Sequence, residues 1–158
     1  GGEQVATATV AGLTGGAHAI TAVYSGDAVF GNSTSAAFTQ NVSQQATKIL
    51  PGLPSYVAGE GIPARNGYVR AKLVDASGAP LAGRTITFTN KPTATRPAYV
   101  LCTAVTGADG IAECDHTAIN IDPSHTGEDI LIDVNGAYDA TYAGSADYAS
   151  STGRGQTF

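Results

Sequence analysis

The sequence predicts an all-β protein in which short antiparallel strands pack as a β-sandwich. Glycine is frequent, with 20 residues among 158, and 7 prolines add further breaks between short segments. Several of these segments alternate apolar and polar side chains, which is typical of a strand with one buried face. No segment has the apolar spacing of an amphipathic helix. The 42% hydrophobic residues are enough to form a core between two sheets.

Two stretches of the chain are nearly the same. Residues 22–34 read Ala-Val-Tyr-Ser-Gly-Asp-Ala-Val-Phe-Gly-Asn-Ser-Thr, and residues 140–152 read Ala-Thr-Tyr-Ala-Gly-Ser-Ala-Asp-Tyr-Ala-Ser-Ser-Thr. They align without a gap at an offset of 118 residues (142 − 24). Self-similarity at a fixed spacing is typical of tandem structural units. We therefore interpret residues 1–43 as the C-terminal part of one module and residues 46–158 as a complete second module.

The first part contains three candidate strands, at residues 5–10, 18–24 and 36–42. Glycine-containing turns at residues 13–16 and 25–27 separate the first two strands and end the second. Three strands are too few for a sandwich. We expect the first part to be incomplete, or to be completed by strands from a partner.

The second part begins with a candidate strand at residues 47–50, followed by a proline- and glycine-rich edge or loop at 51–64. Residues 68–74 and 85–89 alternate, which places two sets of side chains in the core: Val69, Ala71 and Leu73 from the first segment, and Ile86 and Phe88 from the second.

Two hairpins and a last strand complete the second part. Residues 99–105 and 111–115 flank a turn with Asp109-Gly110, and residues 130–134 and 137–142 flank Asn135-Gly136. Residues 155–158 are the expected last strand. About seven or eight strands over residues 46–158 is the number of an immunoglobulin-like (Ig-like) sandwich.

The two cysteines are expected to form a disulfide. If the hairpin is symmetric about Ala108, Cys102 lies opposite Cys114, with the Cα atoms about 4.5 Å apart and within disulfide reach. Two small buried thiols are the alternative. A zinc site is not expected, because a second ligand pair is missing and His116 is too close to Cys114. A disulfide implies an oxidising, extracellular compartment.

Three motifs together resemble the bacterial Ig-like repeat family. Residues 73–88, Leu-Val-Asp-Ala-Ser-Gly-Ala-Pro-Leu-Ala-Gly-Arg-Thr-Ile-Thr-Phe, resemble its D-x-x-G-x-P-v-a-G-a-x-V-x-F run. Residues 102–114 resemble its C-x-A-x-T-D-A-x-G-x-A-x-C hairpin, and Tyr142–Tyr148 its closing a-x-Y-x-G-D-x-x-Y signature. The resemblance implies extracellular modules of surface proteins, adhesins and secreted enzymes that serve as stalks or contacts. Two departures are Ser145, where the family often has Asp, and an acidic insertion at 120–136.

Charge and motif content argue against several classes of function. The net charge is −5 and the 8 Lys and Arg residues are scattered, so neither nucleic acid nor an anionic membrane is an expected partner. No apolar run is long enough for a transmembrane helix. The three histidines, His18, His116 and His125, have no nucleophile motif beside them, so we expect no enzyme activity.

A few residues remain as candidate sites. An acidic cluster, continued by Asp139, is either a calcium site or a solvated acidic rim, and no other cofactor is expected. Its candidate ligands are Asp122, Glu128, Asp129 and Asp133. Asn32 and Asn41 each begin a glycosylation sequon. Tyr24 and Tyr142 each end a strand, so we expect structural tyrosines with a ring in the core and a hydroxyl that tethers a loop.

The sequence therefore favours a non-enzymatic extracellular structural module: a spacer, stalk or filament subunit of a bacterial surface or secreted protein. Its expected partners are neighbouring modules or identical subunits that complete its sheets by strand complementation. One alternative is an adhesion or carbohydrate-binding module, whose loops at 91–98 and 120–129 would contact a surface glycan or protein receptor. Another is an accessory domain of a secreted hydrolase.

Overall fold

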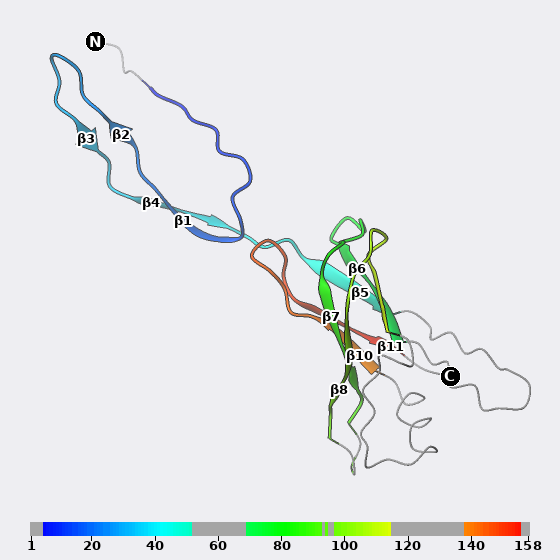
Figure 1. Cartoon of the computed structure of the whole chain (residues 1–158). Coiled ribbons are helices and arrows are strands. Elements are labelled where there is room, and N and C mark those ends of the chain that lie inside the picture. Colours follow the sequence, from blue (N-terminus) through cyan, green and yellow to red (C-terminus); the bar gives the residue numbers. More distant parts are fainter. Residues whose placement is uncertain (1–4, 52–68, 93, 95–96, 115–137, 156–158) are drawn as a thin grey trace, which may run out of the picture. The chain divides into compact units, whose positions relative to one another are not determined.

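The computed structural model describes residues 5–51, 69–92, 94, 97–114 and 138–155. Within these ranges every regular element is a β-strand, and there is no helix. The chain divides into two compact units, Gly1–Gln44 and Gln45–Phe158, hereafter unit 1 and unit 2 (Figure 1). The all-β class is therefore confirmed.

Unit 1 is a long two-stranded hairpin. Its strands are β1 (Gly16–Ile20), β2 (Val23–Tyr24), β3 (Ser33–Thr34) and β4 (Phe38–Val42). Strands β2 and β3 pair next to the turn, and β1 and β4 pair at the other end of the hairpin. Both pairs are antiparallel. Ile20 pairs with Phe38 but Val23 pairs with Thr34, so the returning strand holds one extra residue between these pairs. The extra residue is the mark of a β-bulge.

The expected strand at residues 5–10 is absent, since these residues have no regular structure and are exposed. Alternation alone does not make a strand, because the backbone also needs a partner for its hydrogen bonds. Strand 18–24 is divided into β1 and β2. Strand 36–42 begins at Phe38, with the short β3 before it.

Unit 2 contains two antiparallel sheets. Its strands are β5 (Thr47–Pro51), β6 (Val69–Asp75), β7 (Thr85–Asn90), β8 (Val100–Val105), β9 (Ile111–Cys114), β10 (Tyr138–Tyr142) and β11 (Ser151–Gly155). One sheet has the order β5-β6-β9 and the other has the order β11-β10-β7-β8. The arrangement is consistent with a β-sandwich.

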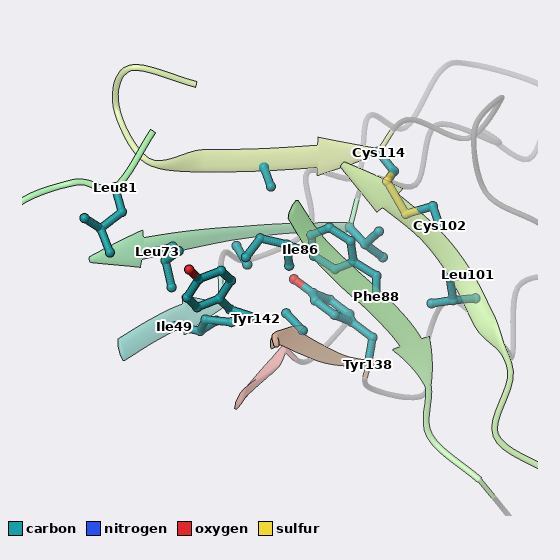
Figure 2. Packing of buried hydrophobic residues seen from close by; sticks show 14 residues of the cluster. Ile49, Leu73, Leu81, Ile86, Phe88, Leu101, Cys102, Cys114, Tyr138 and Tyr142 are labelled. Atoms are coloured by element: carbon teal, nitrogen blue, oxygen red, sulfur yellow. A yellow bond between two sulfur atoms is a disulfide. The ribbon is translucent and has the colours of Figure 1, made fainter. Parts of the chain in front are cut away.

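One hydrophobic cluster joins the two sheets of unit 2 (Figure 2). In β6 and β7 the alternation read from the sequence is confirmed: Val69, Leu73, Ile86 and Phe88 are completely buried and Ala71 nearly so. Strand β10, which pairs with β7 in the same sheet, adds further buried side chains to this core. The centres of the Phe88 and Tyr138 rings lie 5.8 Å apart. The core is therefore made by alternating positions of both sheets.

The disulfide between Cys102 and Cys114 is confirmed, with a Cα–Cα distance of 6.6 Å. The expected hairpin around it is wrong, because β8 pairs with β7 whereas β9 pairs with β6. The bond therefore links one sheet to the other, as Figure 2 shows. Gly110, with φ +77°, turns the chain toward β6, where its carbonyl accepts a hydrogen bond from the Leu73 N–H (2.8 Å). A Cβ at Gly110 would lie 2.6 Å from the Leu73 carbonyl oxygen.

The last strand of the described residues begins earlier than expected. It is β11, Ser151–Gly155, which pairs with β10 directly across the turn at residues 143–150. Residues 156–158 lie outside the described residues, as do most of the 51–64 segment and the Asn135-Gly136 turn. The turn that follows β10 corresponds to the turn of unit 1, and β11 begins at the position that matches the first residue of β3 (151 − 118 = 33).

Reduction of the disulfide should lower the stability of unit 2 by about 2–3 kcal/mol, because closing a short loop restricts the unfolded chain. The measurement is urea unfolding followed by circular dichroism, with and without dithiothreitol. The double variant Cys102→Ala/Cys114→Ala is the control, since reductant should not change its curve. A wild-type curve that reductant leaves unchanged would contradict the prediction.

Candidate functional site

The two repeated sequences form the same turn at the end of a hairpin. Gly26 has φ +86° and Gly144 has φ +92°, a region that favours glycine. A Cβ at Gly26 would lie 3.0 Å from the carbonyl oxygen of Phe30, and a Cβ at Gly144 would lie 3.0 Å from that of Tyr148. These residue pairs are related by the 118-residue offset (144 − 26 and 148 − 30). The sequence repeat is therefore a structural repeat.

A tyrosine and an aspartate organise the turn of unit 1. The hydroxyl of Tyr24 donates to Oδ2 of Asp27 (2.6 Å), and Oδ1 of Asp27 accepts from the N–H groups of Val29 and Phe30 (2.8 Å each). The hydrogen bond from Tyr24, followed by those from Phe30 and Val29, lowers the pKa of Asp27. The same carboxylate raises the pKa of Tyr24.

In unit 2 the equivalent tyrosine has lost this tether. Ser145 replaces the aspartate, and the buried hydroxyl of Tyr142 has no hydrogen-bond partner among the described residues. The two roles expected of the tyrosines are therefore divided. Tyr24 tethers its turn with a side chain that is 43% exposed, whereas Tyr142 is 4% exposed and packs in the core without a tether.

Strand β5 runs beside the closing turn of unit 2, where Gln45 forms a parallel bridge with Tyr148. The Gln45 N–H donates to the Asp147 carbonyl (2.7 Å), and the Ala149 N–H donates to the Gln45 carbonyl (2.8 Å). Both hydrogen bonds lie at the outer edge of the turn. The start of unit 2 therefore pairs in parallel with its end.

The side chain of Thr47 continues this contact along the same edge. Its hydroxyl lies 2.9 Å from the Ala149 carbonyl, to which it donates, and 2.7 Å from Oγ of Ser151. Further along, a Cβ at Gly153 would lie 2.7 Å from Cγ2 and 2.8 Å from the carbonyl oxygen of Ile49. The glycine is therefore needed because β5 crosses β11 closely at this point. A glycine inside a strand was the signal for this contact in the sequence.

The other edge of the same hairpin is also paired in unit 2. Strand β10 lies between β11 and β7, with Tyr142 opposite Ile86 and Ala140 opposite Phe88. The guanidinium of Arg84 lies over the ring of Tyr148, 5.1 Å from its centre. The closing hairpin of unit 2 is therefore paired with β7 along β10, contacted by Gln45 and Thr47 at its turn, and covered by the core on its inner face.

The matching positions of unit 1 are uncovered. Ile20 and Tyr24 are each 43% exposed and Phe30 is 65% exposed. At the equivalent positions of unit 2, Tyr138 is 1% exposed and Tyr142 is 4% exposed, and Tyr148 packs against the core. We call the side chains of Ile20, Tyr24 and Phe30 the open face of unit 1. It is the candidate functional surface.

The other candidate residues do not meet at this surface. Asn32 and Asn41 are exposed in the hairpin of unit 1, as a glycosylated asparagine must be. Asp139 forms an ion pair with Arg154 (3.0 Å) across β10 and β11. The four candidate calcium ligands, Asp122, Glu128, Asp129 and Asp133, all lie outside the described residues. Among the residues that are described, no group of three or more His, Cys, Asp or Glu side chains is placed to hold a metal ion.

The two buried tyrosines of β10 should respond differently to removal of the hydroxyl, as measured by the free energy of unfolding. Tyr142→Phe should leave the free energy of unfolding unchanged or raise it, because the lost hydroxyl is buried without a partner. Tyr138→Phe should lower it by about 1 kcal/mol, because that hydroxyl donates to the Arg70 carbonyl (2.7 Å). Urea unfolding compares the two variants, which lose the same atom from the same strand. Equal losses would contradict this assignment.

Acid should loosen the turn of unit 1. A lowered pKa in the folded state means that ionised Asp27 stabilises the turn above its unfolded pKa of about 3.8, and that this contribution is lost as the pH falls through the folded value. Chemical shifts of the Val29 and Phe30 amides should therefore change below about pH 4. The control is Asp27→Ser, which carries the residue found at the matching position of unit 2, and it should show no such transition. Wild-type shifts that do not titrate would rule out the tether.

No protein-family model matches the chain, and no curated protein matches it either. The part of the chain that the structure describes contains no helix long and apolar enough to cross a membrane.

Proposed function

We propose that the chain is a non-enzymatic structural module of an extracellular repetitive protein, a spacer, stalk or filament subunit of the bacterial Ig-like kind. In this proposal unit 2 is a complete Ig-like sandwich, and unit 1 is the closing hairpin of another module. A neighbouring module or an identical subunit supplies the strands that complete unit 1. The observation that carries the proposal is the pair of homologous hairpins, one enclosed by strands and one open.

The strand order of unit 2 supports the Ig-like assignment. Among the described strands of unit 2, the first, second and fifth, β5, β6 and β9, form one sheet, and the other four form the second sheet. An Ig constant-type sandwich has the same division except that its fourth strand lies in the first sheet. Here the fourth strand, β8, pairs with β7 instead. Related sandwiches share the architecture with such differences in topology.

The disulfide and the charge distribution support the extracellular placement and the structural role. Structural disulfides persist in oxidising compartments. Residues 5–44 contain a single charged side chain, Asp27, if histidine is counted as neutral. Exposed sheet edges in natural proteins are usually protected by charged residues. A hairpin with one charged side chain and several exposed apolar side chains is therefore suited to being covered by other strands.

The alternative functions depend on loops rather than on the hairpins. The glycan- or receptor-binding hypothesis places its contacts at 91–98 and 120–129, of which only residues 91, 92, 94, 97 and 98 are described. The hypothesis of an accessory domain in a hydrolase concerns neighbouring sequence. Both stay predictions, and no contact in the described residues favours either of them.

Self-association through the open face should be measurable on the purified chain. The mass from light scattering should rise with concentration, and the double variant Ile20→Ser/Phe30→Ser should stay monomeric, because it loses the apolar surface that association buries. The control is Val5→Ser, which removes an exposed apolar side chain outside the hairpin and should still associate. A wild-type chain that remains monomeric at every concentration would count against assembly between identical subunits.

A further inference from the structure

The closing turn of unit 2 shows how a hairpin of this type receives a strand. Four groups on its outer edge hydrogen-bond with β5 and the residues before it: the Asp147 carbonyl, the Ala149 N–H and carbonyl, and the Ser151 hydroxyl. All four bind atoms of Gln45 or Thr47, which lie two residues apart in an extended segment. The edge therefore has a defined direction, a defined register and a preference for a hydroxyl side chain.

The same four groups exist in unit 1, where no described residue hydrogen-bonds to them. Subtracting the 118-residue offset gives the Val29 carbonyl, the Gly31 N–H and carbonyl, and the Ser33 hydroxyl. None of them takes part in a hydrogen bond between described residues. The turn that carries them has the same backbone form, since the Asp27 N–H donates to the Phe30 carbonyl at 2.8 Å, as the Ser145 N–H donates to that of Tyr148.

We infer that residues 29–33 of unit 1 are an acceptor edge for a parallel β-strand with the pattern of Gln45-Ala46-Thr47. The occupant is the first strand of a neighbouring module, aligned so that one residue bridges Phe30 and a Ser or Thr two residues later reaches Ser33. The inference rests on the proposed strand complementation, and adds the direction, the register and the chemistry of the donor strand.

The open face lies on the same hairpin and fits the same occupant. In unit 2 the strand continues from Thr47 to Ile49, which is 5% exposed and lies in the core cluster with Tyr142. A β-branched or similar apolar residue at that position of the donor would therefore reach the open face near Tyr24. One strand satisfies the free backbone groups and begins to cover the apolar side chains, two separate costs of an isolated hairpin.

The match between the units ends at Ser35, which occupies the position of Gly153 (153 − 118). Because a Cβ at Gly153 would lie within 3 Å of Ile49, a donor strand cannot approach unit 1 as closely at Ser35. The N–H of Ala22 is bonded to Oγ of Ser35 (2.9 Å), and the β-bulge lies beside it. The close contact therefore covers residues 29–33, and beyond them the donor lies farther from the hairpin than β5 lies from β11.

Disulfide trapping on the full chain tests the register. The hydroxyl oxygens of Thr47 and Ser151 lie 2.7 Å apart in unit 2, so cysteines at the corresponding positions can bond. The probe is a peptide with the sequence of residues 44–51 carrying Thr47→Cys, added to the Ser33→Cys chain under mild oxidation. Both natural cysteines are already in the disulfide, so Cys at position 33 is the only free thiol.

We expect this peptide to be trapped about tenfold faster than one with Lys48→Cys, because in the proposed register the residue at position 47 lies beside Ser33, whereas the side chain at position 48 points to the opposite face. The Gly31 amide should also exchange more slowly after trapping. The matched control chain is Ser151→Cys, where the equivalent edge is occupied by the chain's own Thr47, and it should trap either peptide slowly.

Two outcomes would overturn the inference: equal trapping of the two peptides, or equal trapping by the Ser33→Cys and Ser151→Cys chains. These results are distinct from failure of the proposed function. A chain that associates through its open face but shows no register preference keeps strand complementation and loses the acceptor edge. A strictly monomeric chain that traps the Thr47→Cys peptide selectively keeps the edge and excludes assembly between identical subunits.

Discussion

Enclosure of the closing hairpin is the constraint on which the rest of unit 2 depends. A two-stranded hairpin leaves one apolar face and two rows of backbone groups without partners, and it is marginal in water by itself. In unit 2, β7 pairs with one edge, Gln45 and Thr47 hydrogen-bond to the turn and to the start of β11, and side chains of both sheets cover the inner face. The contact with β5 joins the beginning of the unit to its end, so the unit is closed only when both are present. The disulfide acts elsewhere, where it holds β8 to β9 at the edges of the two sheets.

The two copies of the turn differ in how their strand-ending tyrosine is held. In unit 1 the carboxylate of Asp27 binds the tyrosine hydroxyl and two backbone N–H groups, so the turn is stabilised by local hydrogen bonds. In unit 2 the ring of Tyr142 is fixed by the core, and with Ser145 in place of the aspartate the Tyr142 hydroxyl has no hydrogen-bond partner among the described residues. Burying a carboxylate at such a position would carry a desolvation cost that an exposed turn does not have. The serine is therefore compatible with an enclosed hairpin, and the aspartate with an open one.

The sequence predicted local features well and long-range pairing poorly. Alternation in residues 68–74 correctly identified Val69 and Leu73 as core residues, because burial of one face leaves a period of two. Proximity of Cys102 and Cys114 was also predicted correctly, but for the wrong reason. The sequence of a Gly-containing turn is the same whether the next strand pairs within the same sheet or crosses to the other sheet. Here pairing of β8 with β7 and of β9 with β6 places the two strands in different sheets. The open face could not be predicted from one hairpin alone. It follows from comparing two copies whose surroundings differ.

That comparison also explains which parts of the repeat are free to vary. Gly26 and Gly144 are fixed by backbone geometry, since both have positive φ and close neighbours within their own turns. Gly153 is fixed by a different cause, the passage of β5 across β11, and its counterpart Ser35 lies in a hairpin where no such strand is bound. A donor strand that followed unit 1 as closely as β5 follows β11 would need glycine at position 35. In the proposed complementation, the serine would therefore restrict the donor to a short close contact over residues 29–33, and strands of different sequence beyond the shared hydroxyl position would be able to complete the hairpin.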